Sequence, residues 1–318
     1  MTKQDVLIIK TGYSEILDAR DSSKSSLGDV LRTTPLLHLY KNDNVTWVTD
    51  EDAMPLLEGN PYITKLLPLN VIAIMDLLDS EFDTLINLEK NVSVCKLAKM
   101  IDAWKKYGFR YDRKTDGPEA YDGTLGVFAV SSNIEAKRGN KKTFQQLLFE
   151  MVGREWEGEE YILGYKPKTT EEYDIGLNMT VGSKWPTKCW PFENGKQLEE
   201  MLIKGGFSVS RQDKQGSNVL SNLQGYIDWI NSCKMIVGSD SLGLHLGLAL
   251  KKKVLGIFGP TSNNEIEFYG RGEGILPKPY PLCAPCFKPK CDKKYNLSCI
   301  ELISAEEVYK KIKSFFAT

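Results

Sequence analysis

The segment that decides the fold is MIVGSDSLGLHLGLALKKKVLGIF, residues 235–258. It has an apolar run at 235–237, the turn residues Gly238, Ser239 and Asp240, an apolar stretch at 243–250 and a second short apolar run at 254–258. Short, continuous apolar runs are typical of strands buried on both faces, and the longer stretch between them predicts a helix. The segment is therefore predicted to form a strand–helix–strand unit of a parallel sheet.

The same alternation extends over the rest of the chain. Further strands are predicted at 6–9, 45–49, 84–88, 126–130, 175–179 and 207–210. Helices are predicted at 30–40, 71–78, 193–204 and 222–232, with a last one that begins at the capping-box pattern of Ser304 and Glu307. This pattern predicts an α/β fold whose sheets are covered by helices on both faces.

A polar stretch at 165–172, which contains Pro167, is the predicted linker between two domains. The first would span residues 1–167. The second would span 168–318 and include a cysteine-rich loop at 283–299 and a C-terminal helix. Two doubly wound, Rossmann-like domains predict a ligand cleft between them, at the carboxyl ends of their strands.

Composition excludes several classes of protein. The formal net charge of −1 gives no overall field that would attract nucleic acid or an anionic membrane. The N-terminal apolar run at 6–9 is too short for a signal peptide or a membrane span, so we expect a soluble, cytoplasmic protein with at most peripheral membrane contact. Seven cysteines without an export signal argue against a disulfide framework.

The first segment with predicted chemistry is SSLGDVLRTTP, residues 25–35, which follows the first strand and opens a helix. Gly28 would let the backbone approach a ligand closely. Asp29 would lie in the first helical turn, where the helix dipole keeps a carboxylate ionised, and could accept the proton of an acceptor hydroxyl. The alternative is that Asp29 or Ser26 only stabilises the start of the helix.

The second segment with predicted chemistry is 237–245, the turn and helix start within the 235–258 segment. The N–H groups of Ser241, Leu242 and Gly243 would form an anion site suited to a diphosphate. Asp240 could bond sugar hydroxyls, and His245, one turn into the helix, could reach a phosphate oxygen. The alternative is that Asp240 caps the helix and His245 packs in the core.

The third segment is TVGSKWP, residues 180–186, at the end of the predicted strand 175–179. Thr180 and Ser183 offer hydroxyl groups, and Lys184 offers a cation for a departing diphosphate. The alternative is a solvated loop in which Trp185 packs inward.

Four cysteines, Cys283, Cys286, Cys291 and Cys299, lie within one loop rich in proline and lysine. Four thiolates this close suit a tetrahedral site for structural zinc or iron. Reduced structural thiols or a local disulfide are the alternatives, because the spacing is not that of a standard zinc finger.

These segments, in this order, resemble glycosyltransferase family 9, the ADP-heptose-dependent heptosyltransferases. The resemblance rests on 6–10, 26–35, 82–88, 184–186 and 223–261, and it is most specific at 240–245 and 258–261. The cysteine loop and the helix that contains Glu306, Glu307 and Val308 also match, whereas 90–170 contribute little.

The resemblance implies a GT-B glycosyltransferase that inverts the anomeric carbon of its donor sugar without a catalytic metal. Asp29 would be the general base, Lys184 and Thr180 would neutralise the leaving group, and the 240–245 segment would bind ADP-heptose. Acceptors in the family include lipopolysaccharide core, other glycolipids or glycans, and proteins. Members with a cysteine-bound iron act on autotransporter proteins.

The chain departs from the family at four places. One is mild: the typical Asp-Thr-Gly is Asp-Ser-Leu-Gly at 240–243, which keeps the backbone donors. About a dozen extra residues, roughly 12–24, precede the Asp29 motif and suggest a lid or an acceptor-binding loop. The family's lysine before Trp-Pro commonly sits where this chain has Ser183. The loop 211–215 lacks the glutamate expected near the nucleoside.

Two other functions stay open: a GT-B transferase for another nucleotide sugar, and a sugar-nucleotide-binding protein without catalytic activity. A nicotinamide-dependent oxidoreductase is not expected, because no G-x-G-x-x-G follows the first strand.

Overall fold

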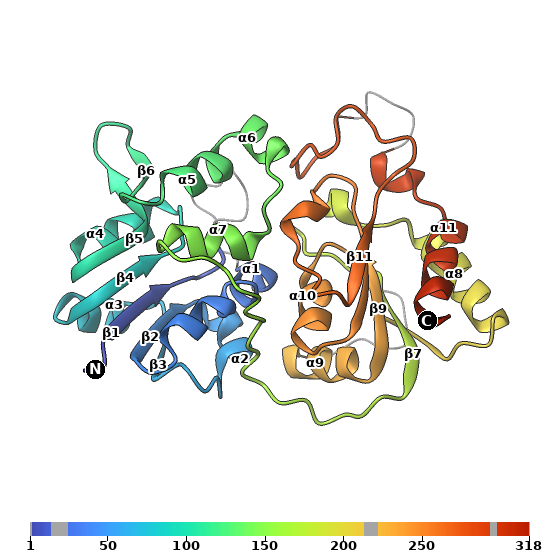
Figure 1. Ribbon diagram of the computed structural model, residues 1–318, viewed down its shortest axis with the longest axis horizontal. Coiled ribbons are helices and arrows are strands. Elements are labelled where there is room, and N and C mark those ends of the chain that lie inside the picture. The colour runs from blue at the N-terminus through green and yellow to red at the C-terminus, as the bar shows by residue number, and fades with distance from the viewer. Residues whose placement is uncertain (1, 14–24, 213–221, 293–297, 318) are drawn as a thin grey trace. The chain divides into compact units, whose positions relative to one another are not determined.

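The computed structural model describes residues 2–13, 25–212, 222–292 and 298–317. The chain divides into two compact units, Met1–Lys166 and Pro167–Thr318 (Figure 1). Each unit is built around its own sheet, so each is described by itself.

The first unit contains a six-stranded sheet in the order β3-β2-β1-β4-β5-β6. All neighbouring pairs are parallel except β5 and β6, which are antiparallel at one edge. The strands are β1 (Asp5–Ile9), β2 (Asn44–Thr49), β3 (Lys65–Pro68), β4 (Glu81–Asn87), β5 (Asp102–Asp112) and β6 (Gly117–Ala120). The apolar run 6–9 is fully buried, as expected of a central parallel strand.

The order in which strands are added to this sheet reverses at β1. The chain proceeds from β1 through β2 to β3 on one side and then crosses to β4 on the other side of β1. A crevice opens outside the carboxyl ends of two strands that diverge in this way, and ligands of open α/β sheets bind there. Lys10 follows β1 and Glu89 follows β4, so both lie at this point.

Helices cover both faces of the first sheet. On one face, α3 and α4 contribute Leu77, Val94 and Leu97 to a core shared with Leu7 and Leu85 of the strands. The helical segments of this unit are α1 (Leu27–Leu31), η1 (Thr34–Tyr40), η2 (Glu51–Ala53), α2 (Met54–Leu57), α3 (Val71–Leu78), α4 (Val92–Met100), α5 (Leu125–Ser132), α6 (Ile134–Gly139) and α7 (Phe144–Met151).

Two sequence-based predictions in this unit were wrong. The strand expected at 126–130 is part of helix α5, because β6 already closes the edge of the sheet and a helix satisfies its own backbone hydrogen bonds. The helix expected at 30–40 is split into α1 and the 3₁₀ helix η1. Pro35 disfavours the α conformation at Thr34 and lacks the N–H that a continuous helix needs.

The second unit contains a five-stranded, fully parallel sheet in the order β11-β10-β9-β7-β8. Its strands are β7 (Tyr173–Asn178), β8 (Val209–Gln212), β9 (Cys233–Ser239), β10 (Lys253–Ile257) and β11 (Gly272–Ile275). The chain adds β8 on one side of β7 and then β9 on the other side. The strand order therefore reverses between β7 and β9.

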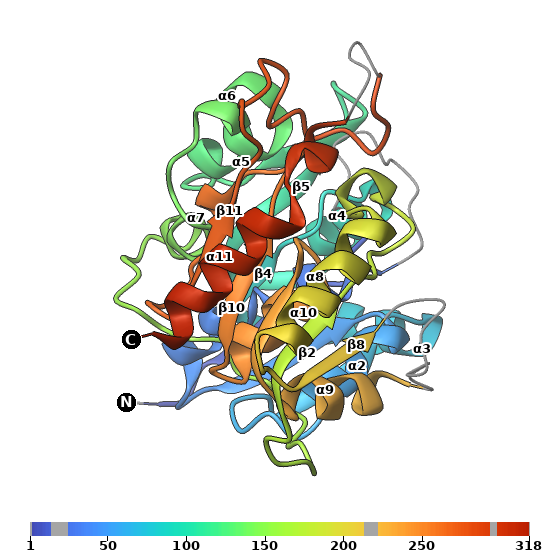
Figure 2. The same cartoon turned by 90° about the vertical axis from the view of Figure 1, so that its right-hand side faces the viewer.

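Two pairs of helices sandwich the second sheet. Helices α8 (Phe192–Lys204) and α11 (Ala305–Phe316) lie side by side on one face, where Leu198 and Val308 enter the same core (Figure 2). Helices α9 (Leu223–Asn231) and α10 (Leu242–Ala249) cover the other face, and the 3₁₀ segments are η3 (Pro186–Lys188), η4 (Asn263–Glu265) and η5 (Cys299–Leu302). The predicted α/β fold with parallel sheets is confirmed.

The predicted caps at two helices of this unit are also confirmed. The side chain of Asn222 accepts a hydrogen bond from the Gly225 N–H at 2.8 Å and so caps α9. Ser304 and Glu307 form the reciprocal bonds of a capping box at the start of α11.

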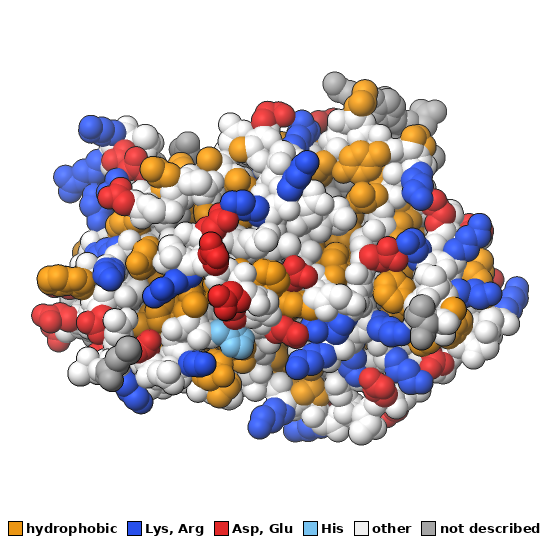
Figure 3. All heavy atoms as spheres, in the orientation of Figure 1, with side chains coloured by type: hydrophobic (Ala, Val, Ile, Leu, Met, Phe, Trp, Pro, Cys, Tyr) orange, Lys and Arg blue, Asp and Glu red, His pale blue; other side chains and the backbone are white. Residues whose placement is uncertain are grey.

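Lys, Arg, Asp and Glu side chains are interspersed over the face shown in Figure 3, in keeping with the near-zero net charge. Within the described ranges, no helix combines the length and apolar character needed to cross a bilayer.

Candidate functional site

The first group of candidate residues lies at the carboxyl ends of β1 and β4. Asp29, on α1, is bonded to the ammonium group of Lys10, which also lies 3.1 Å from Glu89 Oε1. On its other side, Asp29 Oδ1 pairs with Arg32 at 2.7 Å. Lys10, Asp29 and Glu89 are all buried, so two cations and two carboxylates form one nearly water-free network.

This network keeps Asp29 ionised. Burial alone would raise the pKa of its carboxyl group, but the charges of Lys10 and Arg32 outweigh burial and hold the pKa well below its usual range. The Arg32 guanidinium is itself held 3.9 Å above the centre of the Phe144 ring. Gly28 is buried within α1, directly before Asp29.

The second group lies at the carboxyl ends of β7 and β9. Strand β9 ends at Ser239, Asp240 forms the turn, and α10 begins after Ser241, whose side chain makes no capping hydrogen bond. In the part of the chain that the structure describes, no atom accepts a hydrogen bond from the backbone N–H groups of Ser241, Leu242 and Gly243. Three donors at a helix N-terminus are suited to an anion.

Asp240 does not cap α10, because Ser241 occupies the N-cap position. Its carboxylate instead lies 3.0 Å from the ammonium group of Lys188, on η3, and 4.0 Å from His245 Nε2. Burial opposes ionisation of Asp240, but Lys188 and His245 hold its pKa well below the usual range. His245 is buried on α10.

Asn178, the last residue of β7, ties this turn to the sheet. Its amide donates to Ser241 Oγ at 3.1 Å and accepts from the Tyr226 hydroxyl at 2.9 Å. A Cβ added at Gly243 would lie 2.5 Å from both Asn178 Nδ2 and Tyr226 Oη, so only glycine fits there.

The 180–186 segment lies next to this group. Thr180 Oγ1 donates to Gln212 Oε1 at 2.9 Å. Ser183 is exposed and Lys184 is half-buried in the turn, while the indole of Trp185 packs inward. Lys188, rather than Lys184, is the lysine that pairs with Asp240.

The four-cysteine loop does not form a metal site as it is placed. Cys283 and Cys291 are exposed, and Cys286 and Cys299 are half-buried. Burial and the charges of the other three thiols raise the pKa of Cys299 to about 11, so the four lie in one neighbourhood. Across the described residues, however, no three His, Cys, Asp or Glu side chains converge on a point where they could hold a metal ion.

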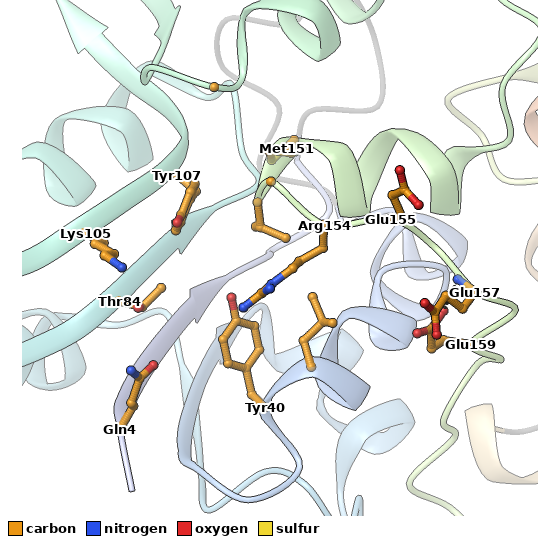
Figure 4. A pocket seen from close by; sticks show the side chains of 14 residues that line it. Gln4, Tyr40, Thr84, Lys105, Tyr107, Met151, Arg154, Glu155, Glu157 and Glu159 are labelled. Atoms are coloured by element: carbon orange, nitrogen blue, oxygen red, sulfur yellow. Dashed lines mark hydrogen bonds between the residues drawn. The ribbon is translucent and has the colours of Figure 1, made fainter. Parts of the chain in front are cut away.

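A cavity of about 650 Å³ lies elsewhere in the first unit (Figure 4). Arg154 extends toward Tyr40, with Lys105 and Tyr107 on the strand side, while Glu155, Glu157 and Glu159 line another part of the cavity. It contains none of the predicted site residues and carries charges of both signs, so it favours no single class of ligand.

Sequence reasoning missed five residues of the two groups: Lys10, Arg32, Glu89, Asn178 and Lys188. The available signal was position, because Lys10, Glu89 and Asn178 all lie where a predicted strand ends. No local pattern marked Lys188.

Residues 211–296 match the family model described as glycosyltransferase family 9 (heptosyltransferase). Lipopolysaccharide heptosyltransferase 1 of Pseudomonas aeruginosa is 23% identical over 312 residues, covering 84% of this chain and 85% of that protein. Among solved structures, E. coli heptosyltransferase WaaC with ADP-2-deoxy-2-fluoro heptose has a TM-score of 0.60 at 17% identity, covering 98% of this chain and 99% of that one. The iron-containing dodecameric glycosyltransferase TibC of enterotoxigenic E. coli has a TM-score of 0.59 at 11% identity, and the match covers 99% of this chain and 76% of that one.

Two parallel α/β units, each with polar residues where its strand order reverses, together with these relatives define a sugar-nucleotide-dependent glycosyltransferase with the GT-B fold. Within that class, the comparisons confirm the resemblance to glycosyltransferase family 9, the heptosyltransferase family.

Proposed function

We propose that this protein transfers a heptose from ADP-heptose to a hydroxyl group of a cell-envelope glycan or protein, with inversion at the anomeric carbon. The first unit would bind the acceptor and the second the nucleotide sugar. The observation that carries the proposal is that each unit supplies one half of the chemistry: a buried, ionised carboxylate in the first, and in the second three N–H groups at a helix start that find no acceptor among the described residues.

The reaction would be a single displacement. The acceptor oxygen attacks the anomeric carbon of the heptose, and the bond from that carbon to the diphosphate oxygen breaks. Asp29 takes the proton of the acceptor hydroxyl, while ADP leaves with the bonding electrons. One displacement from the opposite side inverts the configuration of that carbon.

The departing diphosphate would be stabilised by the second unit. The N–H groups of Ser241, Leu242 and Gly243 point from the start of α10, where the helix dipole also favours negative charge. Lys184 would supply the cation for the leaving group, with Thr180, Ser183 and His245 as further donors. Asp240, held by Lys188, would accept hydrogen bonds from the sugar hydroxyls.

The choice of donor is supported by the relatives. The E. coli heptosyltransferase structure contains a fluorinated ADP-heptose, and a second structure of TibC contains ADP-D-β-D-heptose. For the acceptor, the P. aeruginosa relative is a lipopolysaccharide heptosyltransferase. A lipopolysaccharide-type glycan is the acceptor we propose first, with a protein as the alternative.

Calorimetry with ADP-heptose, UDP-glucose and GDP-mannose tests the donor, and we expect ADP-heptose to bind most tightly. Tighter binding of another nucleotide sugar would instead favour the alternative function, a GT-B transferase with a different donor. ADP release, with water or an added glycan or protein as the nucleophile, then tests turnover.

Asp29→Asn tests the base. We expect ADP release to fall by about 10²-fold or more with donor binding retained, because Asp29 acts on the acceptor proton. Asp174→Asn, which changes an exposed carboxylate paired with Lys234, is the matched control. Full activity of Asp29→Asn would exclude this role, and donor binding without any turnover in the unaltered protein would favour a sugar-nucleotide-binding protein.

A structural metal at Cys283, Cys286, Cys291 and Cys299 is a separate part of the proposal. Four thiolates suit zinc or iron, and binding would require the loop to close around the ion. Elemental analysis of the purified protein should find about one metal ion per chain, lost in Cys291→Ser and retained in Cys189→Ser, which changes an exposed cysteine outside the loop. Metal-free protein of full stability would contradict it.

A further inference from the structure

Glu89 is a fully buried carboxylate that the mechanism above does not use. It follows β4, and its Oε1 accepts hydrogen bonds from the N–H groups of Thr11 at 2.9 Å and Gly12 at 2.7 Å. The same oxygen lies 3.1 Å from the ammonium group of Lys10. A buried carboxylate is costly unless it is paired in this way, so its position calls for an explanation.

The backbone of Glu89 is fixed on both sides. Its N–H donates to Asn87 Oδ1 at 3.1 Å, and its carbonyl oxygen accepts from Asn87 Nδ2 at 3.1 Å. The thiol of Cys95 donates to the same carbonyl oxygen at 3.1 Å. Glu89 is therefore held in a fixed position rather than being a mobile surface residue.

Two routes connect Glu89 to Asp29. The first is electrostatic, because Lys10 is bonded to both carboxylates. The second is through the backbone that Glu89 holds: the Gly12 carbonyl accepts from the Ser26 N–H at 2.9 Å, and the Ser26 carbonyl accepts from the Asp29 N–H at 3.1 Å.

The electrostatic route affects how strong a base Asp29 can be. Asp29 faces two cations, Lys10 and Arg32, and both favour its ionised form. A carboxylate neutralised by two cations is held firmly but is a weak base. Because Glu89 shares Lys10, the positive charge at Asp29 is partly balanced. The two ammonium or guanidinium groups and two carboxylates of these ion pairs sum to zero, and Lys90 is a further cation near them.

We propose that Glu89 is a positioning residue for the transfer reaction, which shares Lys10 with Asp29 and thereby lets Asp29 be held in place while it accepts a proton. This inference rests on the proposed role of Asp29 as the general base. Glu89 acts through Lys10 and does not touch the substrate.

Glu89→Gln is the direct test, because glutamine keeps an oxygen for the Thr11 and Gly12 N–H groups and removes only the charge. We expect kcat for ADP release to fall on the order of tenfold, with the KM for ADP-heptose and the melting temperature nearly unchanged. Glu119→Gln is the matched control, since it breaks a half-exposed pair with Arg110 on β5 and should leave kcat unchanged.

A double-substitution cycle separates the two routes. In a Lys10→Met background, Glu89→Gln should cause no further loss of kcat, because the shared cation is gone. An unchanged kcat in Glu89→Gln, or the same fold-loss in both backgrounds, would overturn the inference. A loss that disappears when activity is normalised to folded protein would also overturn it. Failure of the general-base role would show separately, as full activity of Asp29→Asn.

Discussion

At the scale of single residues, both groups of candidate residues depend on buried carboxylates that lysines keep ionised. Asp29 pairs with Lys10, and Asp240 pairs with Lys188. Because the pKa of each carboxyl group is lower in the folded chain than in the unfolded one, each contributes stability above pH about 4, which is lost as the pH falls below that value.

Removal of Lys188 should therefore leave Asp240 as a buried, unpaired charge. We expect Lys188→Met to lower the free energy of unfolding by about 3 kcal/mol at neutral pH. It should also weaken the binding of ADP, since a bare carboxylate would then lie near the diphosphate. Thermal melting and calorimetry measure the two effects. Lys234→Met, which breaks the exposed pair with Asp174, should leave both nearly unchanged.

Lys90 gives a pH-dependent prediction of opposite sign. Burial, with smaller contributions from Lys137 and Lys10, lowers its pKa from 10.5 to about 8. Between these values the unfolded chain binds more protons than the folded one, so stability should rise with pH across that interval. Lys90→Met should raise the melting temperature near pH about 7, and the gain should shrink toward pH about 10. A gain independent of pH would contradict this assignment.

At the scale of elements, the strand–turn–helix of β9 and α10 depends on close backbone packing. Gly243→Ala would place a methyl group 2.5 Å from Asn178 Nδ2, which donates to Ser241 Oγ, and from Tyr226 Oη, which donates to Asn178 Oδ1. We expect the start of α10 to shift, with a lower melting temperature and at least about tenfold weaker ADP binding.

The control for this prediction is Gly126→Ala in α5, where nothing lies within 4 Å of the added Cβ. That substitution should stabilise the protein by about 0.5–1 kcal/mol, because alanine restricts the unfolded chain and favours a helix. Equal effects of Gly243→Ala and Gly126→Ala on ADP binding would show that close packing at Gly243 is not needed for binding.

How far sequence predicts this molecule also depends on scale. Most central strands, together with α3, α9 and α11, follow from local patterns, and the Asp29 and Asp240 motifs could be placed at strand ends. The sequence did not predict β3, β5, β6 and β11. The strand expected at 126–130 failed because Val and Phe favour strands only where a sheet position is available. Glu89 is 79 positions from Lys10, so their pairing required the parallel register of β1 and β4.

At the scale of the whole molecule, each unit has its own buried core, centred on Leu7 and Leu85 in one and on Ile175 and Val237 in the other. A ligand that contacts one unit should therefore protect that unit first. Hydrogen exchange of the full chain with ADP should show slower exchange in β9 and α10 and little change in β2. Protection confined to α1 would contradict the assignment of the nucleotide to the second unit.

The hydrogen bond between Ser26 and Gly12, together with the one at 2.6 Å from Ser25 Oγ to the Thr11 carbonyl, has a consequence for protein engineering. The chain passes Gly12 and Ser25 at almost the same point, which makes these two residues natural boundaries for exchanging the stretch between them. A chimaera built at these boundaries keeps both anchoring bonds, and its acceptor preference therefore tests the lid or acceptor-binding role expected of that stretch.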